Sequence, residues 1–211
     1  SVNEKRKHDI YTRKQSIIGT NVYANLDESV ACANGRSEDS YLGQVTSSIQ
    51  IRAIQQNTRL SEPFENLRRI SERIERKSGD KPMVGMICLG ELKQYKPRLD
   101  FMKGFLAAGG LQTVESGPKQ SLEQAKQFIL GQKTKYFCLC GSNDQYESEG
   151  HGILSALKKE FPDRIFYLAG LPHKDVHMQW MNEGVNQFIH LKSNCYETLA
   201  FILSEMEVAH R

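Results

Sequence analysis

Histidine side chains are concentrated in the last third of the chain, where they could bind a metal ion or move a proton. His173 and His177 stand four residues apart, so a continuous helix would place both on one face, as in a metal-binding pair. No third ligand is spaced to join them, and residues 172–176 have the composition of a loop or a first helical turn. We therefore predict no metal site.

Carboxylates and thiols offer the next chemistry. Asp144, Glu147 and Glu149 follow the apolar run 136–140, where carboxylates commonly favour a helix N-terminus through its dipole. Cys138 and Cys140 alternate along that run, so both should point to one face of a strand and pack in the core. Neither the carboxylates nor the thiols indicate an active site. We predict no catalytic residue, no zinc site and no disulfide framework.

The composition is that of a globular protein. Of the 211 residues, 39% are hydrophobic and 25% are charged, and 28 basic residues nearly balance 25 acidic ones to give a net charge of +3. This balance is too even for a nucleic-acid-binding surface. The longest apolar runs fall far short of the roughly 18 to 20 residues needed to span a bilayer, and residues 1–13 contain no apolar signal core. We predict a cytoplasmic protein that binds neither nucleic acid nor membrane.

The sequence changes character at residues 77–82, which have the composition of a linker. Downstream, apolar runs alternate with amphipathic segments. The predicted strands cover residues 83–89, 111–115, 136–140, 164–169 and 187–191. The predicted helices cover residues 97–108, a segment that begins at the capping-box residue Ser121, residues 152–161, about 176–183 and 194–208. Such alternation predicts a doubly wound, five-stranded parallel sheet with helices on both faces, and we expect the flavodoxin-like strand order 2-1-3-4-5.

In such a sheet, ligands bind beyond the carboxyl ends of the strands, near the switch point between strands 1 and 3. The segments to consider are therefore 90–96, 141–148 and 170–176. Residues 90–96 contain a single glycine, which excludes a dinucleotide turn, a P-loop and a flavin phosphate cradle. A phosphate-accepting receiver domain would need an aspartate where residues 140–142 read Cys-Gly-Ser, so Lys192 is best explained as a loop residue.

The first 80 residues have a different pattern. Residues 17–23 could form one strand, and residues 48–60 and 63–76 could form helices. One strand and two helices make a poor independent core. We expect this segment either to wrap the α/β domain or to be a piece of a larger domain.

Three loop motifs carry a resemblance to the cobalamin-binding domain of the coenzyme B12-dependent mutases, and the resemblance covers nearly the whole chain. Family members that bind the cofactor have Asp-x-His-x-x-Gly after strand 1, and the histidine ligates cobalt; here residues 90–97 read Gly-Glu-Leu-Lys-Gln-Tyr-Lys-Pro. The family's Ser-x-Leu after strand 3 and Gly-Gly after strand 4 open room for the nucleotide tail. Ser142 matches the serine, Asp144 replaces the leucine, and Ala169 and Gly170 stand for the two glycines.

The sequences of residues 97–105 and 139–146 are most similar to those of the family's small subunit, a non-catalytic paralogue. The resemblance implies that residues 1–80 are the end of a truncated barrel domain plus a wrapping linker and helices. Residues 81–211 would be a degenerate cobalamin-binding-like domain, preceded by this extended strand and helix segment.

The same resemblance implies that Ser142 and Gly170 are vestiges of a cofactor site and that this chain binds no cofactor. Adenosylcobalamin would be held by a partner large subunit in a heterodimer. The alternative is a stand-alone flavodoxin-like binding module for another small ligand. A third reading, a catalytic B12 isomerase component, is disfavoured because residues 90–96 contain no histidine.

Overall fold

The fold was obtained as a computed structural model that describes residues 8–9, 61–118 and 121–209. The predicted strand 17–23 and helix 48–60 lie outside the described residues. The strands are β1 (Met83–Cys88), β2 (Gln112–Glu115), β3 (Tyr136–Cys140), β4 (Ile165–Ala169) and β5 (Val185–Ile189). The helices are α4 (Glu62–Ser78), α5 (Leu92–Ala107), α6 (Leu122–Leu130), α7 (Asn143–Gln145), the π-helix η2 (Tyr146–Gly150), α8 (His151–Glu160), α9 (Lys174–Glu183) and α10 (Cys195–Ala209).

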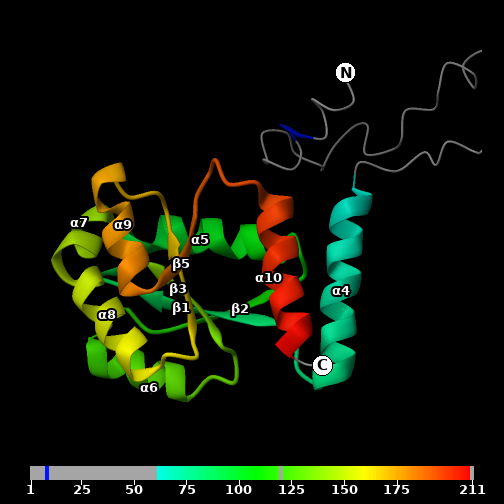
Figure 1. Ribbon diagram of the computed structural model, residues 1–211, viewed down its shortest axis with the longest axis horizontal. Coiled ribbons are helices and arrows are strands. Elements are labelled where there is room, and N and C mark those ends of the chain that lie inside the picture. The colour runs from blue at the N-terminus through cyan, green and yellow to red at the C-terminus, as the bar shows by residue number, and fades with distance from the viewer. Residues whose placement is uncertain (1–7, 10–60, 119–120, 210–211) are drawn as a thin grey trace, which may run out of the picture.

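The five strands form one parallel sheet in the order β2-β1-β3-β4-β5. The predicted flavodoxin-like architecture is therefore confirmed. Helices α5 and α10 pack against one face of the sheet, with α4 beside α10 in the same apolar cluster (Figure 1). Helices α6, α8 and α9 pack against the other face around a second apolar cluster. Strands β1, β3 and β4 are buried on both faces, which explains their nearly continuous apolar sequences.

Local sequence signals position several of these elements. The predicted capping box at the start of α6 is present: the Gln124 backbone N–H donates to the Ser121 hydroxyl at 3.3 Å, and the Ser121 N–H donates to the Gln124 side chain at 3.0 Å. Gly184 ends α9 with φ of 109°. The left-handed backbone at this position favours glycine.

Two predicted boundaries were wrong. Helix α5 begins at Leu92 instead of Pro97, because Glu91 and Gln94 form a capping box one and a half turns earlier and Pro97 is accommodated inside the helix. The prediction rested on the apolar repeat that begins at Leu99, and this repeat does not reveal the turn before Pro97. Strand β5 begins at Val185, two residues earlier than predicted, because the chain enters it directly after Gly184.

The segment after β3 was predicted as a loop up to Ser148 and is helical from Asn143 onward. A short α-helical turn leads into the π-helix η2, which continues as α8. A π-helix has one more residue per turn than an α-helix and no strong sequence signature. The structure therefore places helical turns at the carboxyl edge of the sheet, in the segment that the sequence identified only as a connection near the switch point.

Helix α4 precedes the predicted linker and packs against the α/β core. Phe64, Leu67 and Ile74 are buried in the same apolar cluster as α5 and α10, and α4 and α10 lie side by side (Figure 1). The Ser71 hydroxyl donates to the carbonyl oxygen of Gly110 at 2.8 Å. The packed unit therefore includes residues from Ser61 onward.

The cysteines are packed as the sequence predicted. Cys138 and Cys140 are fully buried on one face of β3, and Cys88 and Cys195 are buried as well, with no disulfide among these four cysteines. Cys32 lies outside the described residues. Among the helices of the described part of the chain, none is long and apolar enough to cross a membrane.

Candidate functional site

Tyr146 occupies the carboxyl edge of the sheet, between the ends of β3 and β4. Its ring is buried, and its hydroxyl lies 2.9 Å from the carbonyl oxygen of Leu139 and 2.8 Å from that of Ala169. The backbone N–H of Gly141 donates to the same hydroxyl at 3.2 Å. The hydroxyl has a single proton, which the two carbonyl oxygens share, so one phenol group links backbone groups at the ends of two neighbouring strands.

Arg98 lies over this tyrosine. The side chain extends from α5 and donates hydrogen bonds to the carbonyl oxygen of Gly141 and to the side-chain oxygen of Asn143. Its guanidinium carbon is 4.6 Å from the centre of the Tyr146 ring, a cation–π distance. The arginine therefore joins the segment after β1 to the segment after β3.

Gly170 lies beside Arg98. Its φ of 117° is unfavourable for other residues. A Cβ at this position would lie 3.0 Å from the arginine Nε and 3.1 Å from its Cζ. The missing side chain of Gly170 thus leaves the space that Arg98 fills.

Ser142 forms the N-cap of α7, where its hydroxyl accepts a hydrogen bond from the Gln145 N–H at 3.4 Å. The two residues predicted as vestiges of a cofactor site, Ser142 and Gly170, therefore lie at the same edge. One starts the helical segment that carries Tyr146, and the other makes room for Arg98.

Trp180 and His151 extend this packed region toward α9. Trp180 is almost fully buried, with its ring edge-on to that of Tyr146 at a centroid distance of 5.8 Å. The His151 ring stacks on Trp180 at 3.8 Å, and its Nδ1 pairs with the Glu183 carboxylate. Gly150 allows this approach, because a Cβ there would lie 3.0 Å from the tryptophan ring.

The electrostatics of the edge favour hydrogen bonding over proton transfer. Burial raises the pKa of Tyr146 well above its ordinary value, with a further increase from nearby Cys140. The phenol therefore stays protonated near neutral pH and can donate to the strand carbonyls. The pKa of Cys140 is also raised well above its usual range, by its hydrogen bond with Cys138 and by burial, so its thiol stays unreactive.

The histidine pair does not converge on a metal site. His173 is the N-cap of α9, with Nδ1 2.8 Å from an Asp175 carboxylate oxygen. The Nε2 of His177 lies 2.7 Å from the carbonyl oxygen of Pro172, and its ring stacks on Phe188. Within residues 8–9, 61–118 and 121–209, no group of three or more potential ligands is placed to hold a metal ion.

Cobalamin does not fit this edge. Residues 91–97 offer no nitrogen donor of the histidine type, and Tyr95 is buried in the core beneath α5. The room that a nucleotide tail would need beside Ser142 and Gly170 is filled by Tyr146 and Arg98. The side chains of the chain itself occupy the place of a ligand.

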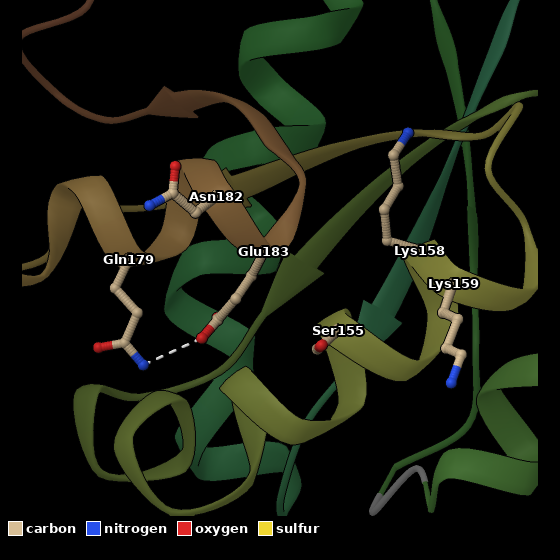
Figure 2. Close-up of a pocket in the computed structure, with 6 residues that line it drawn as sticks. All are labelled: Ser155, Lys158, Lys159, Gln179, Asn182 and Glu183. Atoms are coloured by element: carbon tan, nitrogen blue, oxygen red, sulfur yellow. Dashed lines mark hydrogen bonds between the residues drawn. The ribbon is translucent and has the colours of Figure 1, made fainter.

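A concave region lies between α8 and α9. It is an open depression of about 570 Å³ lined by Ser155, Lys158, Lys159, Gln179, Asn182 and Glu183 (Figure 2). The Lys158 ammonium donates to the carbonyl oxygens of Pro162 and Arg164 at 3.0 and 2.7 Å, so it is already engaged. The remaining polar groups do not converge on one point.

Sequence reasoning missed the residues that close the edge. Arg98 and Tyr146 were quoted as part of a family resemblance but were given no role, and Trp180 and His151 were not connected with them. The one available signal was the position of Arg98 in an otherwise apolar repeat of α5, between Tyr95 and Met102.

Curated proteins named methylmalonyl-CoA mutase small subunit are homologues of this chain. The Porphyromonas gingivalis protein is 26% identical over 197 residues, which cover 93% of this chain and 30% of that protein. The Mycobacterium tuberculosis protein, named a probable methylmalonyl-CoA mutase small subunit, is 25% identical over 96% of this chain and 29% of its own length. The Streptomyces virginiae protein is 29% identical over 53% of this chain. These homologues confirm the resemblance that the loop motifs indicated.

The chain spans about 30% of the length of the first of these relatives, which is consistent with the predicted C-terminal part of such a subunit. No protein-family model matches the chain. Among solved structures, receiver domains from Francisella and Clostridium thermocellum each cover 61% of the chain at 12% and 14% identity, with TM-scores of 0.44 and 0.45.

Proposed function

From its homology to methylmalonyl-CoA mutase small subunits, we propose that this chain is the C-terminal part of the small, non-catalytic subunit of that adenosylcobalamin-dependent enzyme. The subunit supports a large subunit that holds the cofactor and interconverts methylmalonyl-CoA and succinyl-CoA in propionate metabolism. The chain itself binds no cobalamin and performs no step of the isomerisation. Its cytoplasmic location stays a prediction.

The observation that carries this proposal is the filled carboxyl edge. A subunit that bound cobalamin at this fold position would need a nitrogen ligand after β1 and open space beside β3 and β4. This chain has Tyr95 in a helical segment after β1, and it has Arg98 and Tyr146 in the space. The missing nitrogen ligand and the filled space both support a subunit that keeps the architecture of a cobalamin-binding domain but has a different role.

A spectroscopic titration of the full-length subunit with adenosylcobalamin tests the absence of cofactor binding. We expect no spectral change of the cofactor at micromolar concentration. A histidine-ligated, base-off spectrum would contradict the proposal. The homologous large subunit serves as the positive control for binding.

Co-expression of the full-length chain with the large subunit tests the pairing. We expect one small and one large subunit to co-purify, with cofactor in the large subunit only. A full-length small subunit that folds but does not associate would favour the alternative, a stand-alone binding module. A screen of small ligands by thermal shift would then separate that alternative from a purely structural role.

A further inference from the structure

Arg98 makes its contacts across a large separation in sequence. It lies on α5, and its two hydrogen-bond acceptors, Gly141 and Asn143, lie 43 and 45 residues further along the chain. The third contact is the face of the Tyr146 ring. One side chain therefore joins the two βα units that flank the switch point of the sheet.

The three contacts are those that a protein uses to hold a bound cation. A planar guanidinium group presents a fork of donors, and here it meets a carbonyl oxygen, an amide oxygen and an aromatic face. Among the residues that the structure describes, no carboxylate forms an ion pair with Arg98. Gly170 leaves the space in which the group lies.

The segment that receives Arg98 is tied to the sheet through Tyr146, whose hydroxyl reaches the ends of β3 and β4. Ser142 caps the short helix α7, and residues 147–149 are exposed. Among the described residues, Arg98 is the side chain recorded as a hydrogen-bond partner of Asn143. The guanidinium group thus links α5 to residues 141–146 by two hydrogen bonds and a ring contact.

We propose that Arg98 is a built-in ligand, a latch that binds at the switch point and holds the carboxyl edge closed. In related folds a small molecule orders the loops at this place. Here the latch orders residues 141–150 without one. This inference does not depend on the proposed subunit role, because it requires neither a partner nor a cofactor.

Hydrogen exchange on the full-length protein tests the latch, with Arg98→Ala as the main variant. Loss of two charge-assisted hydrogen bonds should speed amide exchange in residues 141–150 by at least about ten-fold. Exchange in β1, β3 and β4 should not change. Lys96→Ala, on the same helix, removes a cation that, among the described residues, pairs with Asp100 across one turn, and it should leave exchange in residues 141–150 as in the wild type.

Chemical rescue then distinguishes a binding site from a merely structural contact. Methylguanidinium at millimolar concentration should occupy the vacated place in Arg98→Ala and return the exchange of residues 141–150 toward the wild-type rate. Tetramethylammonium, which cannot donate a hydrogen bond, should not. Wild-type exchange in Arg98→Ala, or accelerated exchange that methylguanidinium leaves unchanged, would overturn the proposal.

If Arg98→Ala does not fold, Arg98→Lys replaces it. Lysine keeps the positive charge but lacks the planar fork, so faster exchange in residues 141–150 is still expected. Exchange identical to the wild type in Arg98→Lys would overturn the proposal, because a latch of this geometry requires both acceptors to be held together.

Discussion

The hydroxyl of Tyr146 lies 2.8 Å from the carbonyl oxygen of Ala169, at the point where β4 ends. The same hydroxyl reaches the end of β3 through Leu139. These strands are already paired along their length, so the tyrosine adds a polar tie beyond the last ladder hydrogen bonds. The hydroxyl therefore links the ends of β3 and β4 at the edge where ligands bind in doubly wound sheets.

Replacing Tyr146 with phenylalanine should destabilise the fold. The ring would remain, but the carbonyl oxygens of Leu139 and Ala169 and the N–H of Gly141 would lose a partner inside the protein. Buried polar groups left without a partner cost about 1–3 kcal/mol. We expect urea denaturation to show a loss of this size in the free energy of unfolding.

Tyr167→Phe is the matched control for that substitution. The Tyr167 hydroxyl is buried and, in the part of the chain that the structure describes, has no hydrogen-bond partner. Its removal should leave the free energy of unfolding unchanged or raise it by up to about 1 kcal/mol. Equal losses in the two variants would mean that the hydrogen bonds of Tyr146 contribute nothing.

Helix α4 should prove essential to the α/β domain. Leu67 is buried between α4 and the core, so Leu67→Ala should lower the free energy of unfolding by about 2–5 kcal/mol. Arg69→Ala, on the exposed side of the same helix, should change it by no more than about 0.5 kcal/mol. If Leu67→Ala were equally harmless in chemical denaturation, α4 would be an appendage of a domain that begins after residue 80.

Glu205 should make stability depend on pH. Burial raises the pKa of this carboxyl group, and one of its oxygens is buried without a hydrogen-bond partner among the described residues. Between the ordinary value of about 4.3 and the raised value in the folded protein, the folded state binds more protons than the unfolded state. Stability therefore falls as pH rises through this window.

Glu205→Gln should remove that dependence and should be more stable than the wild type above the window. Denaturation at a series of pH values measures the effect. Glu72→Gln removes an exposed carboxylate of α4 and controls for the change in net charge. Parallel pH profiles for the wild type and Glu205→Gln would show that the carboxyl group is solvated in the folded protein.

The thiols of the core should be inert in the native state. Burial raises the pKa of Cys88 to about 12, with Cys140 adding to the effect, and all four described cysteines are buried. In a Cys32→Ser variant, a thiol reagent should label the native protein at least about 10³-fold more slowly than the unfolded chain, since access requires unfolding. Fast labelling of the native variant would place at least one thiol at the surface.

The sequence was sufficient to predict the sheet and its order. Alternating strands and helices with short connections allow few topologies, and the side chains at the Ser121 capping box act within a single turn. The start of α5 was predicted too late, because the apolar repeat marks the helix only from Leu99 onward and the capping box at Glu91 lies before it. Such errors arise where a helix extends beyond the residues of its apolar repeat.

The role of Ser142 and Gly170 as vestiges of a cofactor site stays a prediction. Ser142 and Gly170 were identified from loop motifs and do lie at the carboxyl edge. Arg98 could not be assigned, because its hydrogen bonds join residues more than forty positions apart. Tyr146 could not be assigned either, because one of its partners, Ala169, lies 23 positions away on the next strand. A pattern of neighbouring residues contains no information on such distances.

The π-turn also suggests how such an edge can change during evolution. Its five residues, Tyr146–Gly150, accommodate one residue more than an α-helical path would use. A regular α-helix turns by about 100° per residue, so one residue added to it would rotate everything that follows. A π-turn takes up the added residue within its own wider turn. A change in length by one residue can thus be absorbed at this edge while α8 keeps its packing against the sheet.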